Sequence, residues 1–255
     1  MHWGWTTKYF DATLILLYAF FIFFLGLVYY LQRESKREGY PMYSPEGGRE
    51  LGFPEPPGPK TYETYNEGLV TLPNHRPPRK LAAEPLFFFP GAPLVPTGDP
   101  MVDAVGPASF AQRRMTPLLD TEGVPLVQPL RNLADEWSLD RRDPDPRGMP
   151  VFGADKLLAG EVVDIWIDRT TMFLRYLEVA LAGDPADRVV MPLAVTFING
   201  GKRRISTRAV LAHQFAKAPR LSQPDLITAR EEDQVSAYFA SGYLYATPER
   251  SEPLI

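Results

Sequence analysis

The pattern of apolar and polar residues sets Ala12 to Gln32 apart from the rest of the chain. This stretch has no charged side chain, and its apolar residues run all the way round a helix instead of forming a stripe. At about 1.5 Å of rise per residue the helix would be roughly 30 Å long, the thickness of the hydrocarbon core of a bilayer. The pattern therefore predicts a transmembrane helix at residues 12–32.

Two other interpretations of this stretch fit less well. A cleaved signal peptide would have a short apolar core, a basic start and small residues at its cleavage site. Here Asp11 precedes a long core, and Tyr29-Tyr30-Leu31 stands where small residues would be needed. A buried helix of a soluble protein is disfavoured by the length of the apolar run.

The basic residues beside the stretch predict its orientation. Lys8 precedes it, whereas Arg33, Lys36 and Arg37 follow it. Because Lys and Arg accumulate on the cytoplasmic side of a membrane helix, we expect residues 1–11 to be periplasmic and the rest of the chain cytoplasmic. Residues 33–41 carry several charged side chains, so we expect them to continue the helix beyond the surface of the membrane.

The distribution of proline predicts an extended segment at residues 42–150. Of the 27 prolines, 21 lie between Pro41 and Pro150. Proline lacks a backbone donor and is excluded from helix interiors and central strands. The segment also carries the apolar run Leu86 to Phe89, which a solvated linker would lack. We therefore expect the run to lie against a surface, either of its own domain or of a partner.

Residues 151–255 show the pattern of a small antiparallel β-barrel or sandwich followed by helices. Glu161 to Asp168 alternates, with Val163, Ile165 and Ile167 on the predicted buried face. Further strands are expected at Phe173–Leu181, at Arg188–Leu193, and on both sides of Asn199-Gly200-Gly201, where a hairpin turn with positive φ is predicted.

Helical spacing marks two segments at the end of the chain. These are Arg208–Phe215 and Glu231–Tyr245, and the second begins with three acidic residues, which suit the positive end of a helix dipole. Its aromatic residues favour a helix that covers an open end of the barrel.

Composition excludes several classes of chemistry. The chain has no cysteine, which removes disulfides and thiolate sites, and its net charge of −4 gives no basic face for nucleic acid. His2, His75 and His213 share no metal-ligand spacing. We find no phosphate-binding glycine loop, no Gly-x-Ser-x-Gly and no His-Glu-x-x-His.

Acidic residues near the first hairpin are the remaining candidates for chemistry. They are Asp120, Glu122, Asp164, Asp168 and Glu178, with Arg169 and Arg175 among them. Carboxylates beside arginine ordinarily stay ionised as solvated charges, so the pattern alone allows either that role or proton handling.

Several blocks occur in one order along the chain: Arg37-Glu-Gly-Tyr-Pro41, Pro96-Thr-Gly-Asp-Pro100, Asp103-Ala-Val-Gly-Pro-Ala-Ser109, Val163-Asp-Ile-Trp-Ile-Asp168, Arg175-Tyr-Leu-Glu178 and Glu231-Glu-Asp-Gln-Val-Ser-Ala-Tyr238. Together with the single N-terminal span, they resemble the H subunit of the purple-bacterial photosynthetic reaction centre over nearly the full chain.

This resemblance implies a fold and a set of partners. The expected fold is a single N-terminal transmembrane helix plus a mainly β cytoplasmic domain, a small antiparallel PRC-type barrel with a C-terminal helix. The chain would be a non-catalytic subunit that caps the quinone face of two pigment-bearing core subunits and helps to conduct protons to the secondary quinone. Bacteriochlorophyll, bacteriopheophytin, quinones and non-haem iron would be held by the partners and no cofactor by this chain.

The resemblance also implies site residues. Asp120, Asp168 and Arg175 match proton-transfer positions, and Glu122 could replace a histidine as a surface proton acceptor. The chain departs from the family at Val124 and Thr171, where titrating residues are expected. Positions near a bound phospholipid match Tyr30, Arg33 and Tyr40.

The implied location is the inner (intracytoplasmic) membrane, with a light-harvesting antenna, a cytochrome and membrane lipid as further partners. Two alternatives remain. A membrane-tethered enzyme would need a convergent polar pocket with a histidine or nucleophile pair. A membrane-tethered PRC-barrel adaptor or assembly factor could act outside photosynthesis, although an adaptor for RNA would carry a basic face.

Overall fold

The computed structural model describes residues 11–40, 42–43, 49–50, 52–64, 68–73, 80–89, 91–135 and 137–251. The chain forms two compact units, Met1–Lys80 and Leu81–Ile255. Of the predicted periplasmic segment only Asp11 lies within the described residues.

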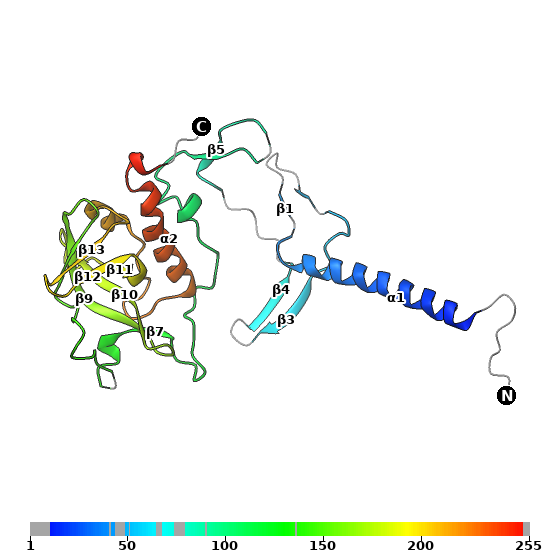
Figure 1. Cartoon of the computed structure of the whole chain (residues 1–255), viewed down its shortest axis with the longest axis horizontal. Coiled ribbons are helices and arrows are strands. Elements are labelled where there is room, and N and C mark those ends of the chain that lie inside the picture. The colour runs from blue at the N-terminus through cyan, green and yellow to red at the C-terminus, as the bar shows by residue number, and fades with distance from the viewer. Residues whose placement is uncertain are drawn as a thin grey trace. The chain divides into compact units, whose positions relative to one another are not determined.

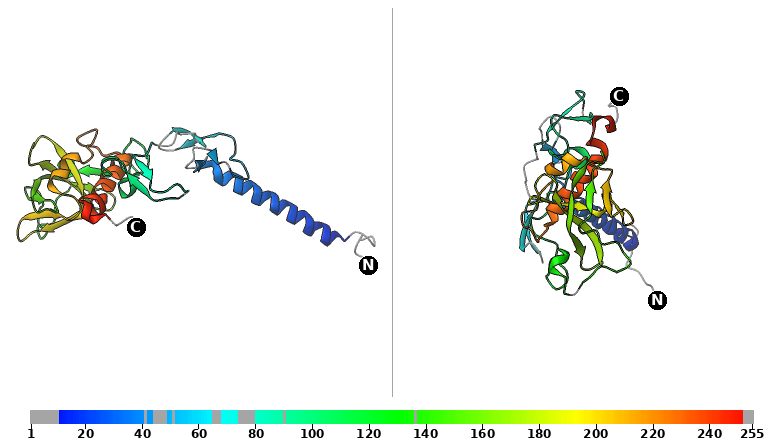
Figure 2. Two further views of the ribbon diagram at one scale, coloured as in Figure 1. Left: turned by 90° about the horizontal axis from the view of Figure 1, so that it is seen from above. Right: turned by 90° about the vertical axis from the view of Figure 1, so that its left-hand side faces the viewer.

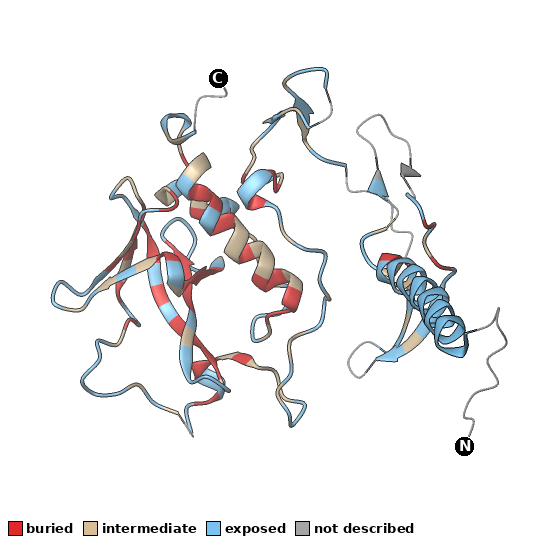
Figure 3. Cartoon of the chain, turned by 45° about the vertical axis from the view of Figure 1, so that its right-hand side comes forward, coloured by how far each residue is buried: buried red, intermediate tan, exposed pale blue. Residues whose placement is uncertain are grey.

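The first unit is dominated by one long helix, α1 (Ala12–Glu34), which Figures 1 and 2 show without a break. The Asp11 carboxylate caps its start by accepting a hydrogen bond of 2.9 Å from the backbone N–H of Thr13. Every residue from Ala12 to Arg33 is exposed (Figure 3). By length and composition, Ala12–Arg37 is the one stretch of the described residues that could cross a membrane. An apolar helix left uncovered by its own chain needs lipid or partner helices around it.

Short strands follow the helix in the same unit. A turn of 3₁₀-helix (Ser35–Arg37) extends α1, and Gly39 leaves it with a φ of 81°. Two antiparallel ribbons come next, β1 (Met42–Tyr43) with β2 (Arg49–Glu50), and β3 (Lys60–Thr64) with β4 (Gly68–Leu72).

The second unit is built on a seven-stranded sheet whose strands lie in the order β11-β10-β9-β8-β13-β12, with β7 pairing to β9 (Figure 1). The strands are β7 (Val127–Pro129), β8 (Pro150–Phe152), β9 (Leu158–Asp168), β10 (Phe173–Leu181), β11 (Arg188–Pro192), β12 (Thr196–Asn199) and β13 (Arg204–Thr207). All pairs are antiparallel except β8 with β13. A separate hairpin joins β5 (Ala83–Pro85) to β6 (Leu94–Pro96).

The predicted buried face of β9 is confirmed at Ile165 and Ile167, but the face predicted to be polar is buried as well. Val163 on the predicted buried face is 36% exposed, whereas Asp164, Trp166 and Asp168 are all at most 5% exposed. Each polar group on the face of Asp164, Trp166 and Asp168 has a partner within the unit, as described below. Burial of this face therefore leaves no carboxylate unpaired. Ile165 and Ile167 are also buried, so the C-terminal half of β9 is covered on both sides.

Two local predictions in the second unit need correction. The β12–β13 hairpin forms, but its positive φ of 43° is at Arg203 and not at a glycine. Gly200 is required for space instead, since a Cβ there would lie 2.8 Å from the Pro144 ring. The helix expected at Arg208–Phe215 is a 3₁₀-helix at Ala212–Lys217.

The C-terminal helix α2 (Ala229–Tyr245) packs along β11 and beside a short 3₁₀ turn at Gly106–Ala108 (Figure 1). Thr228 and Glu231 form a capping box at its start, with Glu232 completing an acidic first turn. Phe239 is completely buried and contacts Phe215 edge-to-face at 5.4 Å between ring centroids, whereas Tyr243 is 49% exposed.

The proline-rich segment at residues 42–150 is divided between the two units. The second compact unit begins at Leu81, and β7 adds Val127–Pro129 to the sheet, so residues 81–150 belong to the β unit. Phe87, Phe88 and Phe89 are 42%, 109% and 56% exposed, so the chain's own described residues do not cover them.

Candidate functional site

The turn after β9 holds Asp168 in a fixed position. Asp168 Oδ1 accepts hydrogen bonds from the backbone N–H groups of Thr170 at 3.0 Å and Thr171 at 3.1 Å. Met172 completes the turn in a left-handed conformation, with φ 60°. A carboxylate that accepts two backbone hydrogen bonds is held rigidly, and its second oxygen remains available for other partners.

Asp168 belongs to an ion group that joins β9, β10 and α2. Arg175 Nη1 lies 3.9 Å from Asp168 Oδ2, and Arg175 Nη2 lies 3.4 Å from Glu232 Oε2. The Tyr176 hydroxyl donates to the same Glu232 oxygen at 3.0 Å. Asp168 and Glu232 are buried, while the Arg175 side chain is 46% exposed. The group therefore presents one accessible cation in front of two shielded carboxylates.

The charges of this group reinforce one another. Burial, and then the neighbouring negative charge of Glu232, raises the pKa of Tyr176, which stays a neutral donor at physiological pH. Burial alone would lower the pKa of Arg175, but the negative charges of Glu232 and Asp168 help to outweigh that effect and raise it. Arg175 is therefore permanently charged.

Asp120 lies in a second, adjacent turn. Its Oδ1 accepts hydrogen bonds of 2.9 Å from the backbone N–H groups of Glu122 and Val124, and its Oδ2 lies 2.7 Å from Arg169 Nη1. The hydrogen bond from Val124, followed by that from Glu122 and the charge of Arg169, lowers the pKa of Asp120. Asp120 is thus ionised near neutrality, and the side chain of Glu122 is exposed beside it.

The structure brings the predicted residues to one end of β9. Arg169 directly follows Asp168, and its backbone N–H donates to the Leu126 carbonyl at 2.9 Å, which ties the turn at Asp120 to the end of the strand. Arg169 Nε is buried and has no hydrogen-bond partner among the described residues. A buried unpaired donor is uncommon, and it marks a place where water or a partner acceptor fits.

A second ion group lies further along the same face of β9. Arg131 Nη1 contacts Asp164 Oδ2 at 2.9 Å and Glu178 Oε2 at 2.6 Å, and Arg131 Nη2 contacts Asp225 at 2.6 Å. Glu178 also accepts hydrogen bonds from Trp166 Nε1 and Arg188. Burial alone would lower the pKa of Arg131, but its bonds to Glu178 and Asp225 raise it.

The predicted lipid residues lie near the C-terminal end of α1. Tyr30 is 57% exposed and Arg33 is exposed, whereas Tyr40 is partly buried with Lys36 Nζ 5.0 Å from its ring centroid. Lys36 also donates to the Pro54 carbonyl at 2.6 Å. Two of the three predicted residues are thus accessible to a ligand, and the third is engaged by a neighbouring cation.

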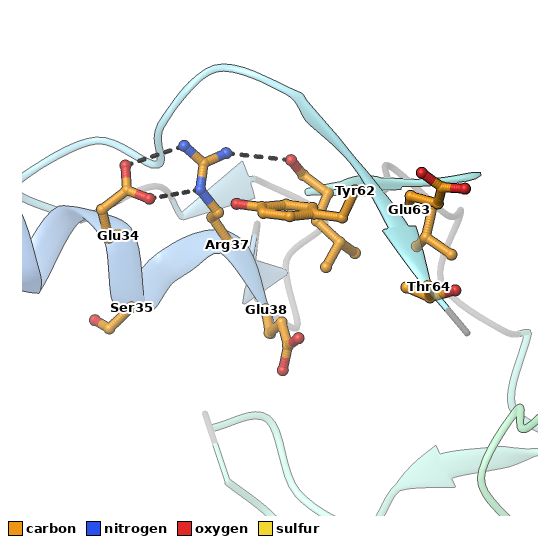
Figure 4. A pocket seen from close by; sticks show the side chains of 9 residues that line it. Glu34, Ser35, Arg37, Glu38, Tyr62, Glu63 and Thr64 are labelled. Carbon is orange, nitrogen blue, oxygen red and sulfur yellow. Dashed lines mark hydrogen bonds and ion pairs between the residues drawn. The ribbon is translucent and has the colours of Figure 1, made fainter. Parts of the chain in front are cut away.

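Arg37 anchors the β3–β4 ribbon to the end of α1. It pairs with Glu34 at 2.7 Å and donates to the carbonyl groups of Gly58 at 2.8 Å and Leu72 at 3.3 Å. Figure 4 shows its guanidinium group between Glu34 and the Tyr62 ring, at the edge of an open groove. Its donors are occupied by the chain itself, so Arg33 is the freer cation at this end of the helix.

Sequence reasoning missed several members of these groups. Arg131, Tyr176, Arg188 and Glu232 were not predicted as site residues, although Glu232 was noted as part of an acidic first turn. The alternation in β9 and β10 places Trp166 opposite Tyr176 and Asp164 opposite Glu178, which could have indicated a shared polar face. Arg131 has no such signal, because it lies 33 residues from Asp164. Among the described residues, no group of three or more metal-ligating side chains is suitably placed for a metal.

Two family models match the chain in succession. Residues 4–132 match the photosynthetic reaction centre H-chain N-terminal region, about half of the chain, and residues 140–213 match the PRC-barrel domain. The chain belongs to the photosynthetic reaction centre H-chain family.

The two matched regions of this H chain meet at the ion groups. Asp120 and Arg131 lie in the H-chain region, whereas Asp164, Asp168 and Arg175 lie in the PRC barrel. The contacts of Arg169 with Asp120 and of Arg131 with Asp164 therefore join the two regions. Membership of the family confirms the predicted combination of a span candidate, a mainly β PRC-barrel domain and a C-terminal helix, and implies association with the reaction-centre core subunits.

Proposed function

We propose that this H chain caps the cytoplasmic quinone face of the two pigment-bearing core subunits and assists proton delivery to the secondary quinone. The proposal rests on the arrangement of side chains where β9 ends and β10 begins. There, shielded carboxylates with arginine partners stand beside a hairpin tip with Met172 and Phe173 72% and 71% exposed.

The exposed tip supports the capping role. Two large apolar side chains at the end of a hairpin are costly in water and are suited to burial against another polypeptide. Docking through Met172 and Phe173 would also cover the adjacent ion group and remove it from bulk water. In such a site each fixed charge acts more strongly on a reduced quinone than it would in solvent.

The carboxylates support the proton role. Asp120 has a lowered pKa, so it acts as a fixed negative charge that gathers protons at the surface, with exposed Glu122 as the acceptor beside it. Asp168 is the inner carboxylate, held by backbone donors. Thr171 cannot titrate, so its hydroxyl group and ordered water would carry the proton onward from Asp168, because a hydroxyl both donates and accepts.

The membrane arrangement follows from the basic residues after α1. Arg33, Lys36 and Arg37 support an arrangement with the β unit in the cytoplasm and residues 1–11 in the periplasm, in a single-pass protein of the inner (intracytoplasmic) membrane. Tyr30, Arg33 and Tyr40 would contact a phospholipid, with Arg33 the cation that meets its phosphate.

The cofactors and further partners follow from the same proposal. Bacteriochlorophyll, bacteriopheophytin, quinones and non-haem iron would be bound by the core subunits, and this chain would act on them only through charge, exclusion of water and proton transfer. A light-harvesting antenna and a cytochrome would be neighbours in the same membrane.

Substitution of the two aspartates tests the proton role. In the assembled complex, Asp120→Asn and Asp168→Asn should each slow the second electron transfer to quinone, by about 100-fold or more for a group on the main path. The first electron transfer, which needs no proton, should be unchanged. Asp145→Asn is the matched control, because Asp145 also pairs with an arginine, Arg147, and accepts a backbone N–H. Unchanged second-transfer rates in both variants would remove these residues from the path.

Extraction tests the capping role. Mild detergent should release the chain together with bacteriochlorophyll-bearing partners, and Met172→Asp with Phe173→Asp should weaken that association. Recovery of the unsubstituted chain as a pigment-free monomer would contradict the proposal.

A further inference from the structure

The β5–β6 hairpin presents an unusual apolar tip. Its loop carries Phe87, Phe88 and Phe89, with Phe88 109% exposed. The rings of Phe87 and Phe89 stack with 5.8 Å between centroids and 11° between planes. Two of the three rings are therefore held together by the hairpin itself, which leaves little side-chain freedom to lose on burial.

The hairpin backbone is closed below the tip. Leu86 N–H donates to the Pro93 carbonyl at 2.8 Å, and Ala92 N–H donates to the Phe89 carbonyl at 3.1 Å. Pro85, Pro90 and Pro93 have no N–H to leave unpaired. The N–H groups of Phe87, Phe88, Phe89 and Gly91 have no partner among the described residues. The tip therefore suits the head-group layer, where water and polar head groups still accept hydrogen bonds, and not the hydrocarbon core.

The polarity of the hairpin favours lipid over a protein partner. No charged residue occurs between Glu84 and Asp99, and the exposed residues that the structure describes in the loop between β5 and β6 are Phe87, Phe88, Phe89, Gly91 and Pro93. A protein interface surrounds its apolar centre with a polar rim that pairs across the contact. The described residues of the loop supply no charged side chain for such a rim, and exposed apolar side chains of this kind suit the boundary between head groups and acyl chains.

The position of the β5–β6 hairpin in the chain also favours lipid as the environment of its tip. Arg37 holds the Leu72 carbonyl at the end of α1, and roughly 14 residues separate Leu72 from Leu86. Since an extended chain reaches up to about 3.3–3.6 Å per residue, the tip can reach the membrane surface. Arg76, Arg79 and Lys80 precede the hairpin in the sequence. Basic residues beside an apolar insertion add attraction to anionic lipids of the cytoplasmic leaflet.

We propose that Phe87, Phe88 and Phe89 insert into the interfacial layer of the membrane that holds α1, as a second and peripheral membrane contact of this chain. The hairpin then fixes the β unit to the bilayer at a point separate from the helix. This contact requires α1 in a bilayer, but it does not require the quinone or proton role, so either proposal can fail without the other.

The absence of cysteine from the sequence makes a site-specific test direct. Phe88→Cys or Leu94→Cys gives one thiol in this chain, which is labelled with an environment-sensitive fluorophore in the complete complex in liposomes containing anionic lipid. The signal of the unsubstituted complex, labelled in the same way, is subtracted. Lys202→Cys, on the exposed β12–β13 loop, is the reference position.

We expect a nitroxide attached high on the lipid acyl chain to quench the labels at positions 88 and 94 several-fold more than the label at position 202, with aqueous iodide giving the opposite order. In the Leu94→Cys background, replacing all three phenylalanines by serine should abolish the lipid quenching, while circular dichroism shows that the fold is kept. Strong quenching by iodide at position 88 would overturn the proposal in favour of a solvated loop. Protection from both quenchers would overturn it in favour of a protein partner.

Discussion

The Tyr176 hydroxyl on β10 donates a 3.0 Å hydrogen bond to Glu232 Oε2 in the first turn of α2. The two residues are 56 positions apart in the sequence, and both are buried. This bond holds the acidic start of α2 against the sheet at the place where Arg175 reaches the same carboxylate. The helix thus supplies one of the two carboxylates of the ion group at Arg175, although it lies outside both regions that match the family models.

Removal of this hydroxyl should destabilise the fold. Tyr176→Phe leaves a buried carboxylate oxygen with only the longer Arg175 contact, so we expect the free energy of unfolding to fall by about 1–3 kcal/mol. Urea unfolding of the full chain in detergent, followed by tryptophan fluorescence, measures the change. Tyr243→Phe is the control, because Tyr243 lies on the same helix but is 49% exposed, and its effect should stay within about 0.5 kcal/mol. Equal effects of the two substitutions would mean that the bond contributes nothing.

Hydrophobic periodicity predicted the strands well because it depends on local pattern. The strand at Phe173–Leu181 begins and ends as predicted, and the uncharged stretch at residues 12–32 lies within α1. Periodicity failed for the faces of β9, since it counts Asp164 and Asp168 as residues that face water. The burial of Asp164 depends on Arg131, which lies 33 residues away and outside any local window. That of Asp168 depends on backbone N–H groups of the following turn, which apolar periodicity does not count.

The sequence blocks include some members of the ion groups and leave out others. Asp168 and Arg175 stand in such blocks, and the structure brings them within 3.9 Å of each other. Glu232 also stands in a block, but its pairing with Arg175 requires α2 to return to β10, a tertiary contact that spacing does not encode. The sequence also left undecided whether Phe87 to Phe89 are exposed, because the pattern alone could not say whether the domain covers them.

Among the arginines, Arg131 should be the one whose substitution lowers the stability of the fold most. Arg131→Met removes the shared cation of Asp164 and Glu178, whose side chains are only 7% and 6% exposed, so we expect a loss of about 2–4 kcal/mol of stability. Glu178 keeps Trp166 and Arg188, and Arg131 is itself one-third exposed, which holds the loss below that of a fully buried pair.

The control for Arg131 is another arginine paired with an aspartate. Arg142 pairs with Asp140 at 2.7 Å, but its side chain is 89% exposed. Arg142→Met should therefore leave the stability unchanged, because an ion pair between exposed side chains contributes little. Both variants are compared by their urea midpoints at one salt concentration. A loss at Arg131 as small as that at Arg142 would show that the two acids do not depend on it.

The capping box of α2 should give a pH-dependent contribution to stability. Burial alone would raise the pKa of Glu231, but hydrogen bonds from Thr228 and Ser222 outweigh it and lower the pKa below 4.5. A carboxylate with a lowered folded-state pKa stabilises the fold above its unfolded pKa, and this contribution is lost as the pH falls through the folded value. The difference in unfolding free energy between the wild type and Glu231→Gln should thus be constant near neutral pH and shrink below about pH 4.5. Urea titrations between pH 3 and 7 measure it, and a difference that grows on acidification would contradict the assignment.

The close approach of α2 to the loop before the 3₁₀-helix at Ala212–Lys217 depends on Gly242. A Cβ at this position would lie 2.5 Å from the Ala209 carbonyl oxygen and 2.6 Å from Val210 Cγ1, and Arg250 Nη1 bridges the Ala209 and Gly242 carbonyl groups at 2.6 Å each. Gly242→Ala must therefore push the helix outward, and we expect a loss of about 1–3 kcal/mol, even though alanine is the better helix former. Gly183→Ala, with no atom within 4 Å of the added Cβ, is the matched control and should melt like the wild type. Thermal melting followed by circular dichroism should show a midpoint lowered by several degrees for Gly242→Ala alone. An unchanged or raised midpoint would mean that α2 tolerates displacement, and with it a looser contact between Glu232 and Arg175.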